Sequence, residues 1–216
     1  MELHVQTRGD FKPNPEHDEI CAIFYSLEGF YDKNCVLTSR KGIIAVSQSC
    51  LGYFKEDINI QRVGSEQEML EIFFQKIQIY DPDIFAGYEL ELGSWGYLIE
   101  RGCALNLNFC NALSRTPLEK DEVKKAQTVF IDEEDTSDSD YFTEQRIRGR
   151  ILLDVWRLMR HEIALTSYTF ENICYHILHR RYPKHSHKTL TEMWNNPLMR
   201  WIVLDYYALR SNTLLE

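Results

Sequence analysis

The chain has 216 residues, a length at which one large domain, or one domain with an insertion, is expected. A hydrophobic content of 44% supplies enough apolar surface for a sizeable core and excludes disorder over most of the length. The formal charge of −9 is unevenly distributed, because residues 145–188 carry nine Lys or Arg against three Asp or Glu. The sequence has no run of 18 apolar residues and no N-terminal signal pattern, so we expect no contact with a membrane.

The cysteines and histidines do not form a recognisable metal site. The six cysteines are widely spaced without a C-x-x-C pair, so we expect reduced thiols. They are Cys21, Cys35, Cys50, Cys103, Cys110 and Cys174. The histidine clusters His176-x-x-His179 and His185-x-His187 lack the cysteine partners of a zinc site, and we interpret them as solvated or hydrogen-bonded side chains.

The N-terminal part of the chain has the composition of β-strands. A short alternating stretch that includes Glu2 and His4 precedes a turn-rich segment at 8–15. Ile20–Leu27 and Gly42–Val46 are rich in β-branched or aromatic residues and predict two further strands. We expect a small antiparallel sheet from these segments.

A well-marked helix follows. Ser65-x-x-Glu68 is a capping box, and apolar residues then recur at helical spacing as far as Tyr80. Asp81-Pro82 ends this helix, and Ile84–Ala86 predicts a short buried strand that leads through a loop into a helix containing Tyr97–Ile99. The alternation of strand and helix favours an α/β fold.

Residues 119–144 interrupt this alternation. They hold ten acidic and three basic side chains, centred on the acidic run 132–140, and we expect an insertion or mobile loop. An acidic loop that binds metal is an alternative, but the glycine-pivoted spacing of an EF-hand is missing. Thr136, Ser137 and Ser139 in this acidic context are candidate phosphate acceptors.

Regular structure is predicted again from Arg150. Arg150–Val155 predicts a buried strand that leads into a helix with Trp156 and Met159. Ser167–Thr169 is expected to cap the next helix, and Asn196-Pro197 is expected to start the last one. The apolar residues assigned to these two helices are Phe170, Ile173, Ile177, Leu178, Leu198, Trp201, Ile202, Leu204 and Leu209.

An ordered set of motifs resembles the exonuclease domain of family B DNA polymerases. The set comprises Asp81-Pro82-Asp83-Ile84-x-x-Gly87-Tyr88, Gly149-Arg150-x-x-Leu153-Asp154 and Ser167-Tyr168-Thr169-Phe170-x-x-Ile173. With Pro13-Asn14-Pro15-Glu16-x-Asp18, the resemblance covers nearly the whole chain as a single domain, residues 1–216. Within that family the chain is most similar to translesion members, through Gly87-Tyr88-Glu89, Ser94-Trp95-Gly96-Tyr97-Leu98 and Tyr168-Thr169-Phe170-Glu171-Asn172. The resemblance implies an α/β, ribonuclease H-like fold with a mixed sheet flanked by helices.

In proofreading members the resemblance implies a 3′ to 5′ exonuclease that uses two divalent ions, and such ions need several converging carboxylates. The family's Asp-x-Glu falls on Glu2-Leu3-His4, its Asn-x-x-x-Phe-Asp ends on Ser94, and its Tyr-x-x-x-Asp falls on Val203 and Tyr207. Three of the four metal carboxylates are therefore missing, and the fourth has changed from Asp to Glu. We predict no catalytic or metal-binding residue at these degenerate positions, and a partly filled, neutral cleft in their place.

Two alternatives remain for this segment. An active two-metal exonuclease would need replacement ligands, but Asp205 is expected to face away from the pocket and Glu91 would reach it only from a helix. A stand-alone interaction scaffold would use the acidic run 132–140 and the basic residues of 146–188 as docking surfaces. The candidates for DNA or subunit contact are Arg146, Arg148, Arg150, Arg157, Arg180, Arg181 and Lys184.

The resemblance also implies a larger parent polymerase that lacks proofreading. The chain contains none of the family's palm aspartate motifs, begins inside the first strand and stops at the last helix, so we expect a fragment without polymerase activity of its own. The parent is expected to use Mg²⁺ in its palm and an iron-sulfur cluster near its C-terminus, with no cofactor in this segment. Primer-template DNA, the rest of the polymerase chain and accessory subunits are the expected partners, and the nucleus is the expected location.

Overall fold

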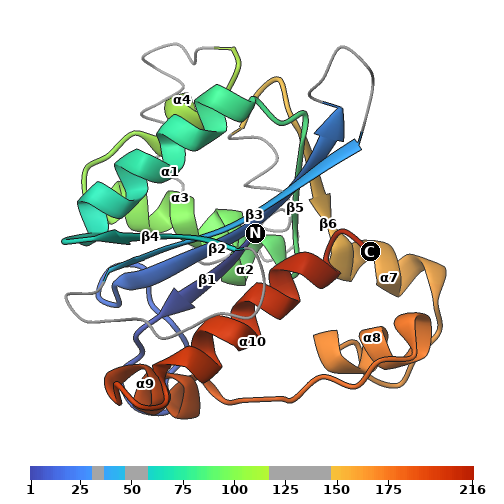
Figure 1. The fold of residues 1–216 in the computed structure, drawn as a ribbon. Helices are drawn as coiled ribbons and strands as arrows, with labels where there is room; N and C mark the ends of the chain where they lie inside the picture. The colour runs from blue at the N-terminus through green and yellow to red at the C-terminus, as the bar shows by residue number, and fades with distance from the viewer. Residues whose placement is uncertain (31–36, 47–57, 117–146) are drawn as a thin grey trace, which may run out of the picture.

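The computed structural model describes residues 1–30, 37–46, 58–116 and 147–216. In this part of the chain, six strands form two sheets, and helices cover both faces of the larger one (Figure 1). The strands are β1 (Glu2–Val5), β2 (Ile20–Phe30), β3 (Leu37–Val46), β4 (Asn59–Val63), β5 (Ile84–Gly87) and β6 (Ile151–Asp154). The mixed α/β architecture predicted from the sequence is confirmed.

The helices alternate with these strands as the sequence predicts. They are α1 (Glu66–Tyr80), α2 (Leu90–Gly93), α3 (Trp95–Ala104), α4 (Phe109–Leu113), α7 (Val155–Glu162), α8 (Phe170–Leu178), α9 (His187–Asn195) and α10 (Arg200–Thr213). At the start of α1, one of the two hydrogen bonds of the predicted capping box is formed as expected, and the other has a different donor. The Ser65 hydroxyl accepts from the Glu68 backbone N–H, but the Glu68 carboxylate accepts from Gly64 one residue earlier.

The larger sheet has the order β1-β2-β3-β4, with antiparallel pairing up to β3 and parallel pairing of β4 to β3. The prediction of an antiparallel sheet is therefore correct for the first three strands, but it did not include the parallel strand β4. The smaller sheet pairs β5 with β6 in parallel. Among the described strands, this one pairing makes up the whole of the second sheet.

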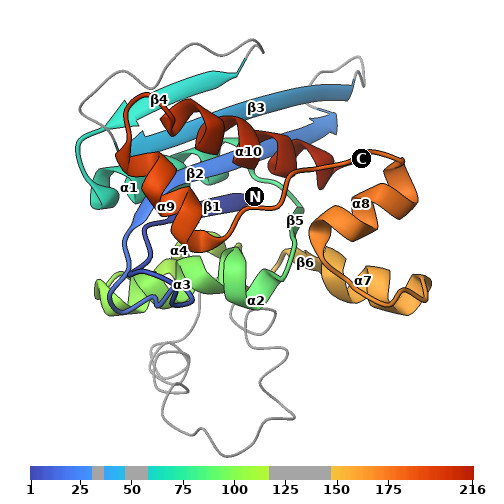
Figure 2. The ribbon, with the colours of Figure 1, turned by 90° about the horizontal axis from the view of Figure 1, so that it is seen from below.

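Alternate residues of β2 supply the two halves of the core, because successive side chains of a strand point to opposite faces. Ile23 lies on the face covered by α1, α3 and α4, and Phe24 lies on the face covered by α9 and α10. Figure 2 shows α10 crossing the larger sheet on the side opposite α1. This second layer is the one that positions the candidate site.

Three expectations about the C-terminal half need correction. The predicted buried strand is a partly exposed edge strand, because β6 pairs only with β5 in the described structure and leaves Ile151 61% exposed. The last helix begins at Arg200 rather than at Asn196, so Leu198 and Trp201 point largely to solvent. Helix α9 was not predicted, since only Leu190 and Trp194 of its nine residues are buried.

The acidic segment 119–144 lies outside the described residues, as do Cys35 and Cys50. The described cysteines, Cys21, Cys103, Cys110 and Cys174, form no disulfide. No helix in the described ranges is both long enough and apolar enough to span a membrane.

Candidate functional site

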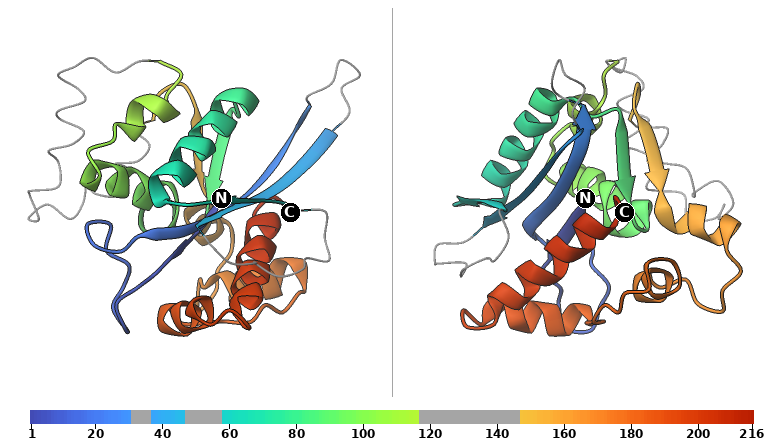
Figure 3. Two further views of the ribbon diagram at one scale, coloured as in Figure 1. Left: turned by 60° about the vertical axis from the view of Figure 1, so that its left-hand side comes forward. Right: turned by 45° about the vertical axis from the view of Figure 1, so that its right-hand side comes forward.

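The residues that the sequence comparison assigned to the first and third motifs converge where α10 crosses β1. Glu2 and His4 share one face of β1, because residues two apart in a strand point the same way. Helix α10 packs on that face (Figure 3, right). Its Val203 and Tyr207 belong to the same core cluster as Phe24. The structure therefore brings together residues separated by about two hundred positions in the sequence.

Arg210 is the central charged group of this site, and the motif analysis did not identify it. Its Nε lies 3.2 Å from Glu2 Oε2, and its Nη1 lies 3.4 Å from Glu171 Oε1. Nη1 also donates to the Tyr206 hydroxyl at 3.3 Å, while the guanidinium carbon stands 4.1 Å from the centre of the Phe170 ring. This one side chain connects β1, α8 and α10.

The arginine remains a cation despite its burial. Burial alone lowers its pKa, but the negative Glu2 and then the neighbouring tyrosines and Glu171 outweigh that effect and raise the pKa above its ordinary value. Two carboxylates thus share one permanently charged partner. The expectation of a neutral cleft is wrong in this respect, because the cleft holds a buried ionic cluster.

His4 is completely enclosed. Its ring lies 4.7 Å from that of Trp194 and 5.5 Å from that of Tyr207, measured between ring centres. Burial, and to a lesser degree the charge of His187, lowers the pKa of His4 to about 3, so the imidazole is neutral at physiological pH. Both His4 ring nitrogens and Glu2 Oε1 have no hydrogen-bond partner among the described residues.

Ser94, which the sequence comparison assigned to the position of the second motif's aspartate, lies at the junction of α2 and α3. Its hydroxyl donates to the Met1 carbonyl at 3.1 Å, so Ser94 fixes the start of β1. Gly87 permits this approach, since a Cβ atom there would stand 2.6 Å from Ser94 Oγ. The Ser94 side chain is buried and engaged with backbone.

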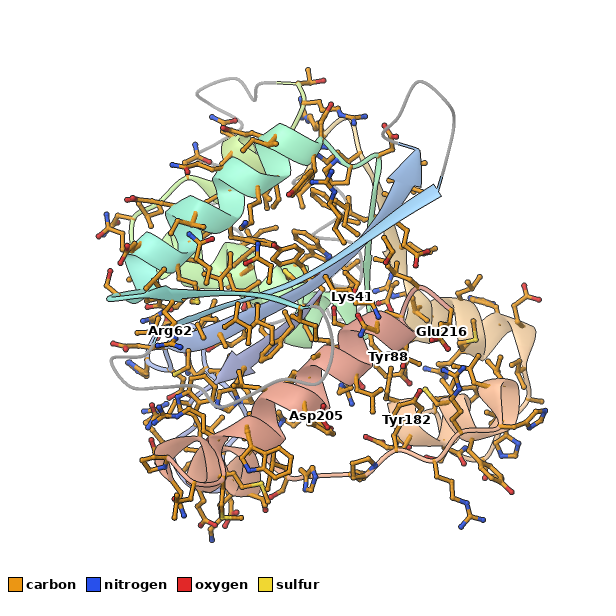
Figure 4. The ribbon with its side chains drawn as sticks, in the orientation of Figure 1. Lys41, Arg62, Tyr88, Tyr182, Asp205 and Glu216 are labelled. Carbon is orange, nitrogen blue, oxygen red and sulfur yellow. The ribbon has the colours of Figure 1, made fainter. Side chains whose placement is uncertain are left out.

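Val203 and Tyr207, the third motif's positions, fill the remaining space with apolar groups. The Tyr207 ring stacks on Phe24 at 5.2 Å, and burial raises the pKa of its phenol. Val203 is fully buried. Asp205 is exposed on α10, as expected, and lies on the side of the helix away from the core (Figure 4).

Three further acidic residues lie in or next to this site, and the motif analysis did not assign them to it. Glu171 pairs with it directly, while Glu89 and Asp154 are close enough to influence each other's charge. Burial raises the pKa of Glu89, and Asp154 and Glu2 add to that rise while Arg210 opposes it. Glu89 and Asp154 lie inside two of the motifs quoted above, Gly87-Tyr88-Glu89 and Leu153-Asp154. That location was the sequence signal that could have assigned them to the site.

The residues present do not fit a pair of divalent ions. A two-ion site needs several carboxylates with free oxygens, but Glu2 is paired with Arg210, and Asp154 caps α7 by accepting from the Trp156 N–H at 3.0 Å. In the described ranges, no three His, Cys, Asp or Glu side chains form a group that could hold a metal ion. We therefore derive no metal-dependent step from this geometry.

The predicted DNA or subunit contacts are not one continuous surface. Arg150 is 4% exposed and donates to the carbonyls of Leu113 and Pro82, so it holds β5, β6 and α4 together. Arg157 lies 3.7 Å from Asp154, and Arg180 pairs with Glu216. The remaining candidates divide into three exposed residues, Arg148, Arg181 and Lys184, and Arg146, which is outside the described residues.

Comparison with known proteins identifies the class of domain to which this site belongs. The family model for the exonuclease domain of family B DNA polymerases matches residues 2–173, so the chain belongs to this family. The chain is also 45% identical to the DNA polymerase zeta catalytic subunit of Drosophila melanogaster over 97% of its length. It is 36% and 35% identical to the same subunit of Homo sapiens and Mus musculus, again over 97% of the chain.

These relatives confirm the predicted resemblance to family B polymerases and show that, within the family, the chain is similar to zeta-type catalytic subunits. The chain spans 10% of the Drosophila melanogaster protein and 7% of the other two. It therefore corresponds to the exonuclease-like part of proteins that are many times longer.

Proposed function

We propose that this chain is a non-cleaving exonuclease-like domain, which serves a zeta-type polymerase as a structural module beside the DNA channel. The observation that carries the proposal is the position of Arg210, 3.2 Å from Glu2, the one carboxylate left at the four metal-ligand positions of the three motifs. A fixed guanidinium at this distance neutralises the carboxylate and repels any divalent ion that would use it.

The surrounding substitutions support the same conclusion. His4 is buried and uncharged, Ser94 is bonded to β1, and Tyr207 contributes an apolar ring where the active family has carboxylate oxygens. Hard cations such as Mg²⁺ and Mn²⁺ prefer carboxylate and water oxygens to these groups. The site retains the architecture of the family without its ligands.

The role in the parent follows from this loss. A polymerase that extends mispaired or damaged primer ends benefits from the absence of an editing site that would excise them. We infer a nuclear translesion polymerase that uses palm Mg²⁺, a C-terminal iron-sulfur cluster and accessory subunits. Of the candidates for contact with DNA phosphates or a subunit, Arg148, Arg181 and Lys184 are exposed.

A nuclease assay tests the proposal. The chain is incubated with 5′-labelled single-stranded DNA in Mg²⁺ and separately in Mn²⁺, beside a Glu2→Gln variant and an active family B exonuclease domain as positive control. We expect no shortening from the 3′ end by either form of this chain. Shortening that the Glu2→Gln variant loses would contradict the proposal.

A residual exonuclease is the second candidate, and one observation favours it. Glu2 Oε1 and both His4 nitrogens are buried and lack hydrogen-bond partners in the described structure, so their capacity to bind a ligand is unused. The assay above separates the two candidates, because a weak nuclease that uses these atoms would show activity in Mn²⁺ that depends on Glu2.

A further inference from the structure

Residues 175–188, which end α8 and begin α9, combine basic side chains without any acidic one. This stretch, called the basic segment below, holds four Lys or Arg and four His, but no Asp or Glu. Figure 1 shows the part between the two helices as an extended stretch that runs beside α10. A local excess of positive charge on an exposed surface attracts a partner of negative charge.

Two side chains fix the basic segment to α10. Tyr182 Oη lies 2.9 Å from Thr213 Oγ1, and the ring of His185 lies 5.2 Å from the ring of Tyr206, measured between their centres. Tyr206 and Thr213 are buried, whereas Lys184, between the two anchors, is exposed. A partner would therefore meet backbone that is already ordered around Lys184, which lowers the entropy cost of binding.

The end of α8 adds a preformed pair of an arginine and a tyrosine. The Arg181 guanidinium carbon lies 5.4 Å from the centre of the Tyr175 ring, in a cation–π contact, and both residues are exposed. Ile177, in the last turn of the same helix, is 40% exposed. Tyrosine and arginine are enriched where proteins bind one another, because each combines apolar surface with a polar group. The basic segment thus offers apolar contact area together with charge.

The contacts of Tyr175 favour an acidic polypeptide over a nucleic acid as the partner. Single-stranded nucleic acids bind basic surfaces through aromatic rings on which their bases stack. Arg181 already lies over the Tyr175 ring, and the His176 ring meets it at 5.4 Å and an angle of 77°. A base would have to compete with these contacts. A carboxylate can accept hydrogen bonds from the Arg181 N–H groups and leave the cation–π pair in place.

The charge around the basic segment points the same way. The whole chain has a formal charge of −9, although this segment is basic. Glu192 on α9 is exposed, and Glu216 pairs with Arg180. A long nucleic acid would meet such carboxylates as it left the segment, since charges act over about 8 Å at physiological ionic strength. A short acidic segment of a protein can end before it reaches them.

We propose that the basic segment docks an acidic segment of another polypeptide, with Arg181 and Lys184 as its charged contacts and Tyr175 and Ile177 as its apolar contacts. The carboxylates of the partner would accept hydrogen bonds from the two cations, and an apolar side chain between them would pack on Tyr175. None of these residues is one of the degenerate motif positions. The inference therefore goes beyond the non-cleaving role proposed above, and the nuclease assay does not decide it.

Fluorescence anisotropy tests the proposal with the full chain and a labelled probe peptide, Glu-Glu-Asp-Leu-Glu-Asp-Phe-Glu. One control probe has Gln and Asn in place of Glu and Asp, and a second has Ala in place of Leu and Phe. An oligo-dT strand measures nucleic-acid binding in the same buffer. The test variant carries Arg181→Gln and Lys184→Gln. The matched control variant carries Arg62→Gln and Arg148→Gln, which remove two exposed basic residues outside the basic segment.

We expect the acidic probe to bind the unmodified chain, with an affinity that falls as the NaCl concentration rises. The test variant should bind this probe about fivefold more weakly or worse, while the control variant stays within about twofold of the unmodified chain. The uncharged probe should not bind. Tyr175→Ala should weaken binding of the acidic probe more than binding of its alanine copy, because only the former has apolar side chains to pack on the ring.

Equal affinities of the test and control variants for the acidic probe would overturn the proposal. Tighter binding of oligo-dT that the test variant loses would also overturn it, by identifying nucleic acid as the ligand. A third form of the chain has Gln and Asn in place of the acidic residues of 132–140. If this form binds the probe several-fold more tightly, the occupant is the chain's own acidic run, and the proposal of another polypeptide is wrong.

Discussion

At the scale of single residues, one arginine accounts for the character of the site. Arg210 contacts Glu2 of β1 and Glu171 of α8, and it lies over Phe170. Its side chain is 15% exposed, so both ion pairs are shielded from solvent. A buried charge of this kind stabilises a fold only while its partners remain, because removal of one partner leaves an uncompensated charge.

Replacement of the arginine tests this role. Arg210→Met should lower the free energy of unfolding by about 3 kcal/mol, because Glu2 and Glu171 lose their partner. Urea denaturation measures the change, and Arg181→Met, an exposed position, is the control. Adding Glu2→Gln to Arg210→Met should recover part of the loss. If Arg210→Met and the parent chain had equal free energies of unfolding, the ionic cluster would make no contribution to stability, and the account of Arg210 would be wrong.

His4 gives the site a pH dependence with a defined sign. The folded chain keeps His4 neutral down to about pH 3, whereas the unfolded chain takes up a proton near pH 6.5. The unfolded state binds more protons between these values, so stability falls as pH falls through this window. Since carboxylates titrate here too, the contribution of His4 needs a comparison with a variant.

His4→Phe is that variant. It removes two buried nitrogens without described partners, so at pH 7 it should be neutral or stabilising by about 1 kcal/mol. On acidification from pH 7 to 4, it should lose roughly 3 kcal/mol less stability than the parent, because its unfolded state gains no imidazolium. Denaturant titrations at several pH values measure both effects. Parallel pH profiles for the two chains would contradict a neutral His4.

At the scale of elements, the site depends on the tight junction between α2 and α3. Gly96 lies against the preceding turn, and a Cβ atom there would stand 2.1 Å from the Glu91 backbone oxygen. Backbone on both sides of the contact leaves little room for adjustment. This junction places Ser94 against the start of β1.

Gly96→Ala should therefore cost about 2 kcal/mol of unfolding free energy or more. Gly64→Ala is the matched control, because its nearest neighbour is the end of the flexible Glu68 side chain at 3.5 Å. Thermal unfolding of the two variants gives the comparison. A Gly96→Ala chain as stable as Gly64→Ala would mean that α2 and α3 can separate without penalty.

The sequence predicted those elements whose signals are local. Helix α1 and strands β2 and β5 were predicted because caps, periodicity and β-branched runs act within a few residues. β6 was misjudged because its apolar residues line an edge. Arg210 was missed because its role depends on three elements meeting, although its position three residues after Tyr207 on α10 was a usable signal.

At the scale of the whole molecule, the two faces of the larger sheet differ in the chemical character of the side chains that cover them. The face toward α1 is a continuous apolar core, whereas the face toward α10 ends in the ionic cluster around Arg210. An active exonuclease would place metal ions at the second position, where their charge would balance the carboxylates. In this chain a protein cation, Arg210, lies beside Glu2 at that position, which is the basis of the proposal that the domain does not cleave DNA.

The most direct test is anomalous diffraction from crystals of the chain soaked in MnCl₂. The account predicts no manganese peak within coordination distance of Glu2, with the Arg210 guanidinium in place beside it. Two peaks about 3.5–4 Å apart among Glu2, Glu89 and Asp154, with Arg210 displaced, would contradict it.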